Sequence, residues 1–80
     1  MMNRVTLTLT LEDKLALNYV SDGAISFGPA TRFTYWKHGV DGQIDRGTQR
    51  VVDRFKSIDL DTIAPSLADK IRDFIAAVEA

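Results

Sequence analysis

A strict alternation of polar and apolar residues near the start of the chain constrains its fold more than any other feature. Residues 4–11 read Arg-Val-Thr-Leu-Thr-Leu-Thr-Leu, so that every second side chain is apolar and β-branched threonines fill the positions between. A period of two places all the apolar side chains on one face of a β-strand. The pattern therefore predicts a half-buried strand over residues 4–11.

The segment that follows this strand is compatible with two interpretations. As a helix, it would begin with a capping box formed by Thr10 and Asp13. Its apolar stripe would then comprise Leu11, Leu15 and Tyr19. As a strand, residues 15–20 would pair with residues 24–28 across a three-residue loop that ends in Gly23. The pairing register that this loop sets would place the apolar side chains of both segments on one face, and we therefore favour the strand.

Another strand is predicted over residues 31–38, where aromatic side chains fall on both faces. Phe33 and Tyr35 share one face, and Trp36 and His38 share the other. Pro29 cannot donate a hydrogen bond to a ladder, so it marks a strand end, an edge or a bulge. Aromatic residues on both faces indicate a strand that is covered on both sides or used at an interface.

The second half of the chain changes to helical spacing. Apolar residues at intervals of three and four predict helices over residues 48–58 and 66–79, the second of which follows Pro65 and begins with a Ser66–Asp69 capping box. We therefore expect a single α+β domain spanning residues 1–80. Its antiparallel meander sheet has three to four strands, with the two helices packed on one face. The predicted core comprises Val5, Leu7, Leu9, Leu17, Phe27, Phe55, Ile71, Phe74 and Ile75.

The composition excludes several kinds of chemistry. The chain has no Cys, which excludes disulfides, thiolate zinc ligation and thiol catalysis. His38 is the single histidine, and zinc sites usually need three or four protein ligands, so we expect no metal or other cofactor. Asp59 and Asp61 resemble the first acids of a calcium loop, but the Gly and distal Glu that the loop requires are missing. Glycine-rich phosphate loops and nucleophile elbows are also missing, so we expect a protein that is not an enzyme.

The chain has no apolar run long enough to span a bilayer, and its first residues lack the continuous apolar core of a secretion signal. We therefore expect a cytoplasmic protein that does not bind membranes.

The formal net charge of −1 conceals an uneven distribution along the chain. Residues 32–56 contain six Lys or Arg against three Asp, whereas residues 57–80 contain two against five acidic residues. Three of the arginines, Arg46, Arg50 and Arg54, are spaced four apart and would form one stripe if the helix extended back to Arg46. Gly47 disfavours that extension. Whether the acidic last helix neutralises the stripe is left open by the sequence.

These features favour a small non-enzymatic protein-interaction module that acts as an inhibitor, adaptor or assembly protein by occupying a partner surface. Small phage and plasmid proteins that inhibit host machinery share this compact, Cys-free, motif-poor character. Exposed aromatic residues and arginines commonly dominate binding energies at such surfaces. The predicted partner-binding residues are Arg32, Tyr35, Trp36, Lys37, Arg46, Arg50 and Arg54.

Two other partners remain open. An accessory nucleic-acid-binding protein would use the arginine stripe for phosphates and the aromatic strand for bases, although a pI near 5.6 argues against it. A homodimer would pair edge strands or bury Trp36.

Overall fold

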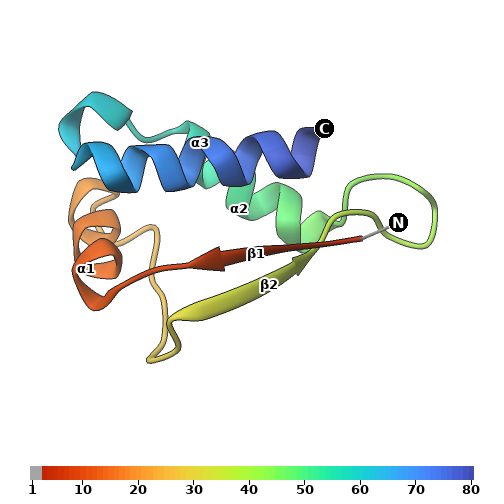
Figure 1. The fold of residues 1–80 in the computed structure, drawn as a ribbon, viewed down its shortest axis with the longest axis horizontal. Helices are drawn as coiled ribbons and strands as arrows, with labels where there is room; N and C mark the ends of the chain where they lie inside the picture. Colours follow the sequence, from red (N-terminus) through yellow and green to blue (C-terminus); the bar gives the residue numbers. More distant parts are fainter. Residues whose placement is uncertain (1–2) are drawn as a thin grey trace.

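Two antiparallel strands and three α-helices form the fold over residues 3–80, the part of the chain that the computed structural model describes (Figure 1). The elements follow in the order β1 (Arg4–Thr8), α1 (Leu11–Val20), β2 (Arg32–Trp36), α2 (Arg46–Lys56), the 3-10 turn η1 (Leu60–Thr62) and α3 (Pro65–Glu79). The α+β class agrees with the prediction, whereas the predicted three to four strands and two helices do not match this arrangement.

The sheet pairs the first predicted strand with the last one. Val5 lies opposite Tyr35 and Leu7 lies opposite Phe33, on the face that is turned toward the helices. The alternation that predicted β1 is thus preserved, with apolar residues inward and Arg4, Thr6 and Thr8 exposed. The strand is shorter than the predicted range 4–11 because Thr10 already caps the following helix.

The predicted strand over residues 15–20 is wrong, because residues 11–20 form α1. The capping box is present at its start: the Thr10 side chain accepts from the backbone N–H of Asp13, and the Asp13 carboxylate accepts from that of Thr10, both at 3.0 Å. The N–H groups at the first turn of a helix need such acceptors. Leu17 faces the core from the middle of this helix.

The predicted strand over residues 24–28 is also wrong, because polar side chains occupy its backbone carbonyls. Lys14 donates to the carbonyls of Gly28 and Ala30, at 3.0 and 2.8 Å. Asn18 and Arg54 donate to other carbonyls of the same segment. The carbonyls of this segment take their hydrogen bonds from side chains and not from a β-ladder, and the segment is an irregular loop that is held by α1 and α2.

Both later helices begin earlier than predicted. Asp45 caps α2 by accepting from the N–H of Thr48 at 3.1 Å, and this cap starts the helix at Arg46 despite Gly47. Helix α3 has Ala64 at its cap and Pro65 in its first turn, without a side-chain cap hydrogen bond. The predicted Ser66–Asp69 capping box is therefore wrong. Proline suits the first turn, where its missing N–H would have no helical partner.

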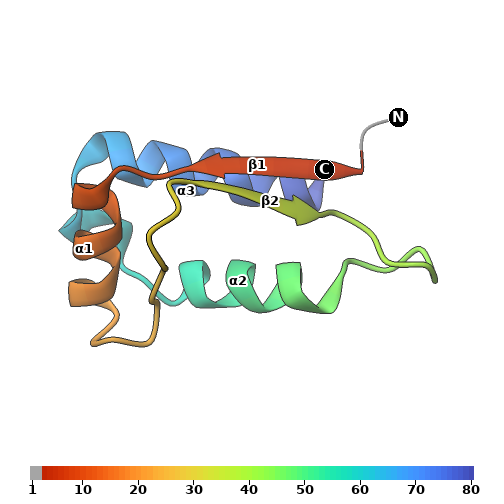
Figure 2. The ribbon, with the colours of Figure 1, turned by 90° about the horizontal axis from the view of Figure 1, so that it is seen from below.

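Helix α3 packs against β1 on the inner face of the sheet, and α2 runs beside α3 (Figures 1 and 2). The ring of Phe74 in α3 packs against the sheet and against α2: its centroid lies 5.3 Å from that of Tyr35 in β2 and 5.7 Å from that of Phe55 in α2. Most of the predicted core is confirmed: Leu7, Leu9, Leu17, Phe55, Ile71 and Phe74 are buried. Val5, Phe27 and Ile75 are only partly buried and pack around this core.

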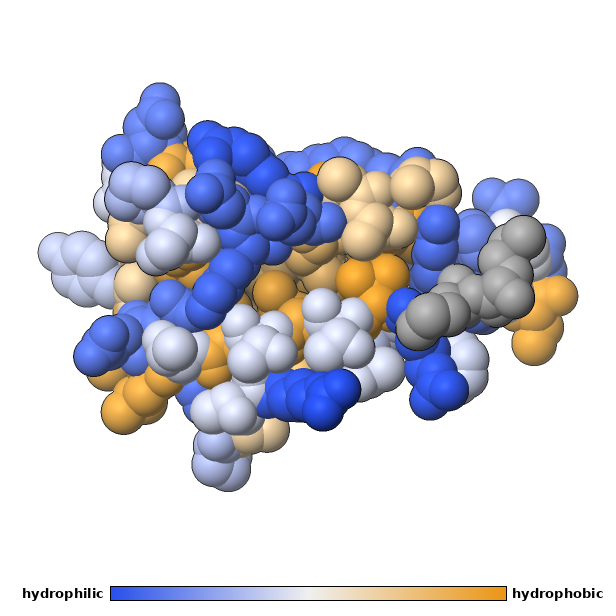
Figure 3. Space-filling model, in the orientation of Figure 1, coloured by the Kyte–Doolittle hydropathy of each residue, from blue (hydrophilic) through white to orange (hydrophobic). Residues whose placement is uncertain are grey.

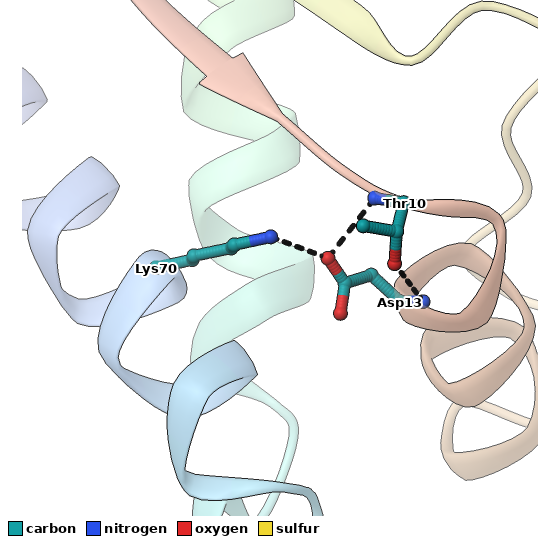
Figure 4. Close-up of polar contacts among 3 residues, drawn as sticks. All are labelled: Thr10, Asp13 and Lys70. Carbon is teal, nitrogen blue, oxygen red and sulfur yellow. Dashed lines mark hydrogen bonds and ion pairs between the residues drawn. The ribbon is translucent and has the colours of Figure 1, made fainter.

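An ion pair joins the beginning of α1 to α3. The Lys70 ammonium lies 2.6 Å from the same Asp13 oxygen that accepts from the Thr10 N–H (Figure 4). Partial burial alone would raise the pKa of Asp13, but these hydrogen bonds and the charge of Lys70 outweigh it and hold the pKa below its usual value of 3.8. The capping box is therefore also a tertiary contact.

Candidate protein-interaction surfaces

The residues predicted to bind a partner divide between the two faces of the sheet and α2. Arg32 and Trp36 are exposed on the outer face of the sheet, which no helix covers among the described residues. Tyr35 lies on the inner face, where its ring packs on Phe74 and burial raises the pKa of its hydroxyl. Lys37 follows β2 and is half-buried. The structure thus separates Tyr35 from the other aromatic residue of the predicted surface.

Trp36 is the largest exposed side chain on the outer face of the sheet, with 55% of its surface accessible. The guanidinium of Arg4, its cross-strand neighbour, lies 5.4 Å from the centre of its ring. This is the distance of a cation–π contact, which orients both side chains on the sheet surface. Trp36 also borders a shallow hollow that is lined in part by His38 and Val40.

The three arginines of α2 form the predicted row on its solvent-facing side, and we call Arg46, Arg50 and Arg54 the arginine row. Arg54 donates a hydrogen bond to the carbonyl of Ala24 at 2.8 Å. Within residues 3–80, Arg46 and Arg50 take part in no ion pair and no side-chain hydrogen bond.

The acidic last helix does not neutralise this row. Its carboxylates Glu79 and Asp69 pair instead with Lys56 and Arg72. The nearest acid on α2, Asp53, accepts a hydrogen bond from Gln49 at 2.8 Å. The question that the sequence left open is thus answered for α3: within residues 3–80, its carboxylates form no ion pair with Arg46 or Arg50. Asp53 borders the same hollow as both arginines.

A second row, which was not among the predicted site residues, lies on the outer face of α1. Leu11, Leu15 and Tyr19 are 64%, 61% and 86% exposed, and their spacing of four residues places them on the same side of the helix. We call these three residues the apolar row. The opposite side of α1 supplies Leu17 to the core. The signal was present in the sequence, because the capping box and this stripe define the helical alternative.

Among residues 3–80, no group of three or more His, Asp or Glu side chains is placed to hold a metal ion. The Asp13 carboxyl, whose pKa is lowered, is held by Lys70 and Thr10 in a structural contact. Within the same residues, no helix is both long enough and apolar enough to cross a membrane.

Comparisons of the chain with protein-family models, with curated proteins and with solved structures found no match. The case for a function therefore depends on the exposed surfaces themselves.

Proposed function

We propose that this protein is a small non-enzymatic protein-interaction module, which acts as an inhibitor, adaptor or assembly protein by occupying a partner surface. The observation that carries the proposal is the apolar row of Leu11, Leu15 and Tyr19 on the outer face of α1. Contiguous apolar side chains on the surface of a soluble domain commonly mark a protein-binding site.

The apolar row has the form of a helix that binds in a groove. Side chains at i, i+4 and i+8 on one helical face are the anchors by which amphipathic helices enter hydrophobic grooves. Two aliphatic side chains and one tyrosine would supply most of the buried area, and the Tyr19 hydroxyl would keep a polar partner at the rim. The partner would therefore present an apolar groove about two helical turns long.

The rigid attachment of α1 supports this role. Its first turn is tied to α3 through Lys70 and Asp13, and Lys14 and Asn18 hold the following loop. A helix that is already formed and fixed loses less conformational freedom on binding than a disordered peptide does. The apolar row is thus presented on a helix that is already formed.

The proposal is tested by capturing partners from a lysate of the native host with the immobilised protein. The test variant carries Leu15→Lys and Tyr19→Lys, which keep the helix and remove the apolar row. The matched control carries Ala76→Lys and Ala77→Lys, which add the same two charges at exposed positions of α3. We expect one specific protein to bind the wild type and the control, and to be lost from the test variant. Equal capture by both variants would contradict the proposal.

A second candidate function, nucleic-acid binding through the arginine row, is favoured by the lack of acidic partners at Arg46 and Arg50. Phosphate contacts release counterions, so the affinity would fall steeply with salt. Titration of labelled single- and double-stranded DNA at two salt concentrations tests it, with Arg46→Gln and Arg50→Gln as the variant. Binding at low salt that the variant loses would favour this function, and no binding at low salt would eliminate it.

A further inference from the structure

Strand β1 has one edge that is paired with β2 and one edge that is open. The N–H of Lys37 donates to the carbonyl of Asn3 at 2.8 Å, and the N–H of Leu9 donates to that of Thr31 at 2.7 Å. In an antiparallel pair, backbone groups point alternately toward and away from the partner strand. The backbone groups of the odd-numbered residues therefore face β2, and those of Arg4, Thr6 and Thr8 face away from it. We call these three residues the open edge.

At the opposite margin of the sheet, the carbonyl of Trp36 points away from β1 and accepts from the Thr48 hydroxyl of α2. Helix α2 lies on this side of β2 (Figure 2). Within residues 3–80, the backbone groups of the open edge make no hydrogen bond to a side chain or to another segment. Figure 2 shows β2 on one side of β1 and no other element in the plane of the sheet on the other side.

An open edge is a template for a further strand, since each N–H and carbonyl there can pair with an extended backbone. Besides short length and charged side chains, which β1 shows in its five residues and in Arg4, natural edge strands are commonly protected by proline, by a bulge or by an inward-pointing charge. The open edge has none of these: β1 pairs with β2 without a break in register, and its inward positions are occupied by Val5 and Leu7. This edge is therefore competent to accept a strand.

The position of α3 decides which kind of strand fits. Helix α3 packs on β1, above it in Figure 1 and behind it in Figure 2, where the molecule is seen from below. Strands pair about 4.8 Å apart, whereas packed helices need about 8–10 Å between their axes. A second copy paired through the same edge would bring its own α3 onto the same face at strand spacing, and the two helices would collide. The occupant must therefore be a strand that carries no helix above it.

We propose that the open edge binds an extended peptide segment of a partner protein by antiparallel β-augmentation. The peptide alternates apolar and polar residues, because its side chains opposite Val5 and Leu7 point toward the side covered by α3. Figure 3, drawn in the orientation of Figure 1, shows apolar surface in the middle of the molecule, in the region where Figure 1 places α3 above β1. Opposite Arg4, the matching side chain lies on the outer face and is acidic, since it meets the guanidinium there. This site is separate from the apolar row, so it stands without the function proposed above.

The test uses the capped peptide acetyl-Thr-Val-Thr-Val-Glu-amide, whose register places its central Thr opposite Thr6 and its Glu opposite Arg4. Two further peptides distinguish edge pairing from other binding. N-methylation of the central Thr removes an N–H that pairs with β1, whereas N-methylation of the first Val alters an N–H that points away. The chemical shifts of the backbone amides of the labelled protein are followed during titration.

We expect the chemical shifts of the backbone amides of Arg4, Thr6 and Thr8 to change as the parent peptide is added up to about 1 mM. This concentration suits the weak affinity that a short single strand would have. The peptide methylated at Val should bind within about threefold of the parent, and the one methylated at Thr should bind at least about tenfold more weakly. Absence of shifts at the open edge with the parent peptide, or equal binding of the two methylated peptides, would overturn the proposal.

A variant of the edge itself completes the test. Thr6→Pro removes an outward N–H and leaves the β1–β2 hydrogen bonds intact, which is the edge position that proline tolerates. We expect it to weaken the parent peptide at least about tenfold, while Thr6→Ala, which keeps the N–H, changes affinity less than about twofold. Full binding by a folded Thr6→Pro protein would contradict the proposal. So would edge amides that shift with protein concentration alone, because a second copy would then occupy the edge.

Discussion

The apolar row of α1 and the arginine row of α2 have the same spacing and opposite chemistry. Each row places three side chains four residues apart on the solvent side of its helix. The arginine row faces water, as charged side chains usually do. The apolar row also faces water, although side chains of its kind usually lie in a core. Helical spacing therefore shows which side chains share a face, but it does not show which face is buried.

The difference lies in what each row contributes to folding. Helix α2 buries Thr48, Val52 and Phe55 on the face opposite its arginines, so the division between its faces follows polarity. Helix α1 buries Leu17 and Lys14, while it leaves two other leucines and a tyrosine exposed. The apolar row is consequently available for binding at little cost to the stability of the fold.

The largest effect on stability is expected within α1 itself. Leu17→Ala should lower the free energy of unfolding by about 2–5 kcal/mol, because Leu17 is fully buried and its removal leaves a cavity. Leu15→Ala, the same change on the apolar row, should alter it by less than about 0.5 kcal/mol. Denaturant unfolding of the two variants checks this comparison. Equal losses would show that the apolar row is packed rather than exposed.

A smaller loss is expected when the attachment of α1 is cut. Asp13→Ala removes half of the capping box and the ion pair with Lys70, and should cost about 2 kcal/mol at pH 7. Because the pKa of Asp13 is lowered in the folded protein, its contribution is complete above the unfolded value of 3.8 and is lost as the pH falls through the folded value.

The difference between wild type and Asp13→Ala should therefore shrink in unfolding experiments repeated toward pH 3. A difference that stays constant over this range would show that the Asp13 carboxylate contributes nothing to the attachment of α1.

The smallest effects on stability are expected within the arginine row, where Arg54 should contribute more than Arg50. Arg54→Ala should cost about 1 kcal/mol because its guanidinium holds the carbonyl of Ala24, and Arg50→Ala should change stability by less than about 0.5 kcal/mol. Thermal unfolding of both variants measures the difference. An Arg50→Ala loss as large as that of Arg54→Ala would mean that Arg50 is held within the molecule and is not free for an anionic partner.

The sequence predicted the parts of the fold that depend on local periodicity, namely β1, β2 and the two later helices. It failed at α1 because both interpretations of residues 11–20 satisfied a local pattern. A contact that supports the helix beyond its local capping box, the ion pair of Asp13 with Lys70, comes from far along the chain. The loop after α1 was mistaken for a strand for the same reason, since Lys14 and Arg54 reach its carbonyls only in the folded structure.

The candidate surfaces were predicted only in part. The arginine row was correctly placed on a helix face, because charge at helical spacing is visible in sequence. The apolar row was missed as a binding surface, because an apolar stripe is usually a sign of the core. The open edge of β1 was also beyond prediction, since it depends on which strands pair and on where α3 lies.

The central claim, that the apolar row binds a partner protein, is tested most directly by site-specific photo-crosslinking. A photoreactive phenylalanine analogue is placed at Tyr19, at Arg50 or at the exposed Asp73 of α3, and each protein is irradiated in a lysate of the native host. The account predicts one discrete protein adduct from position 19 and none from position 73. Adducts from position 50 alone, or the same adducts from all three positions, would contradict it.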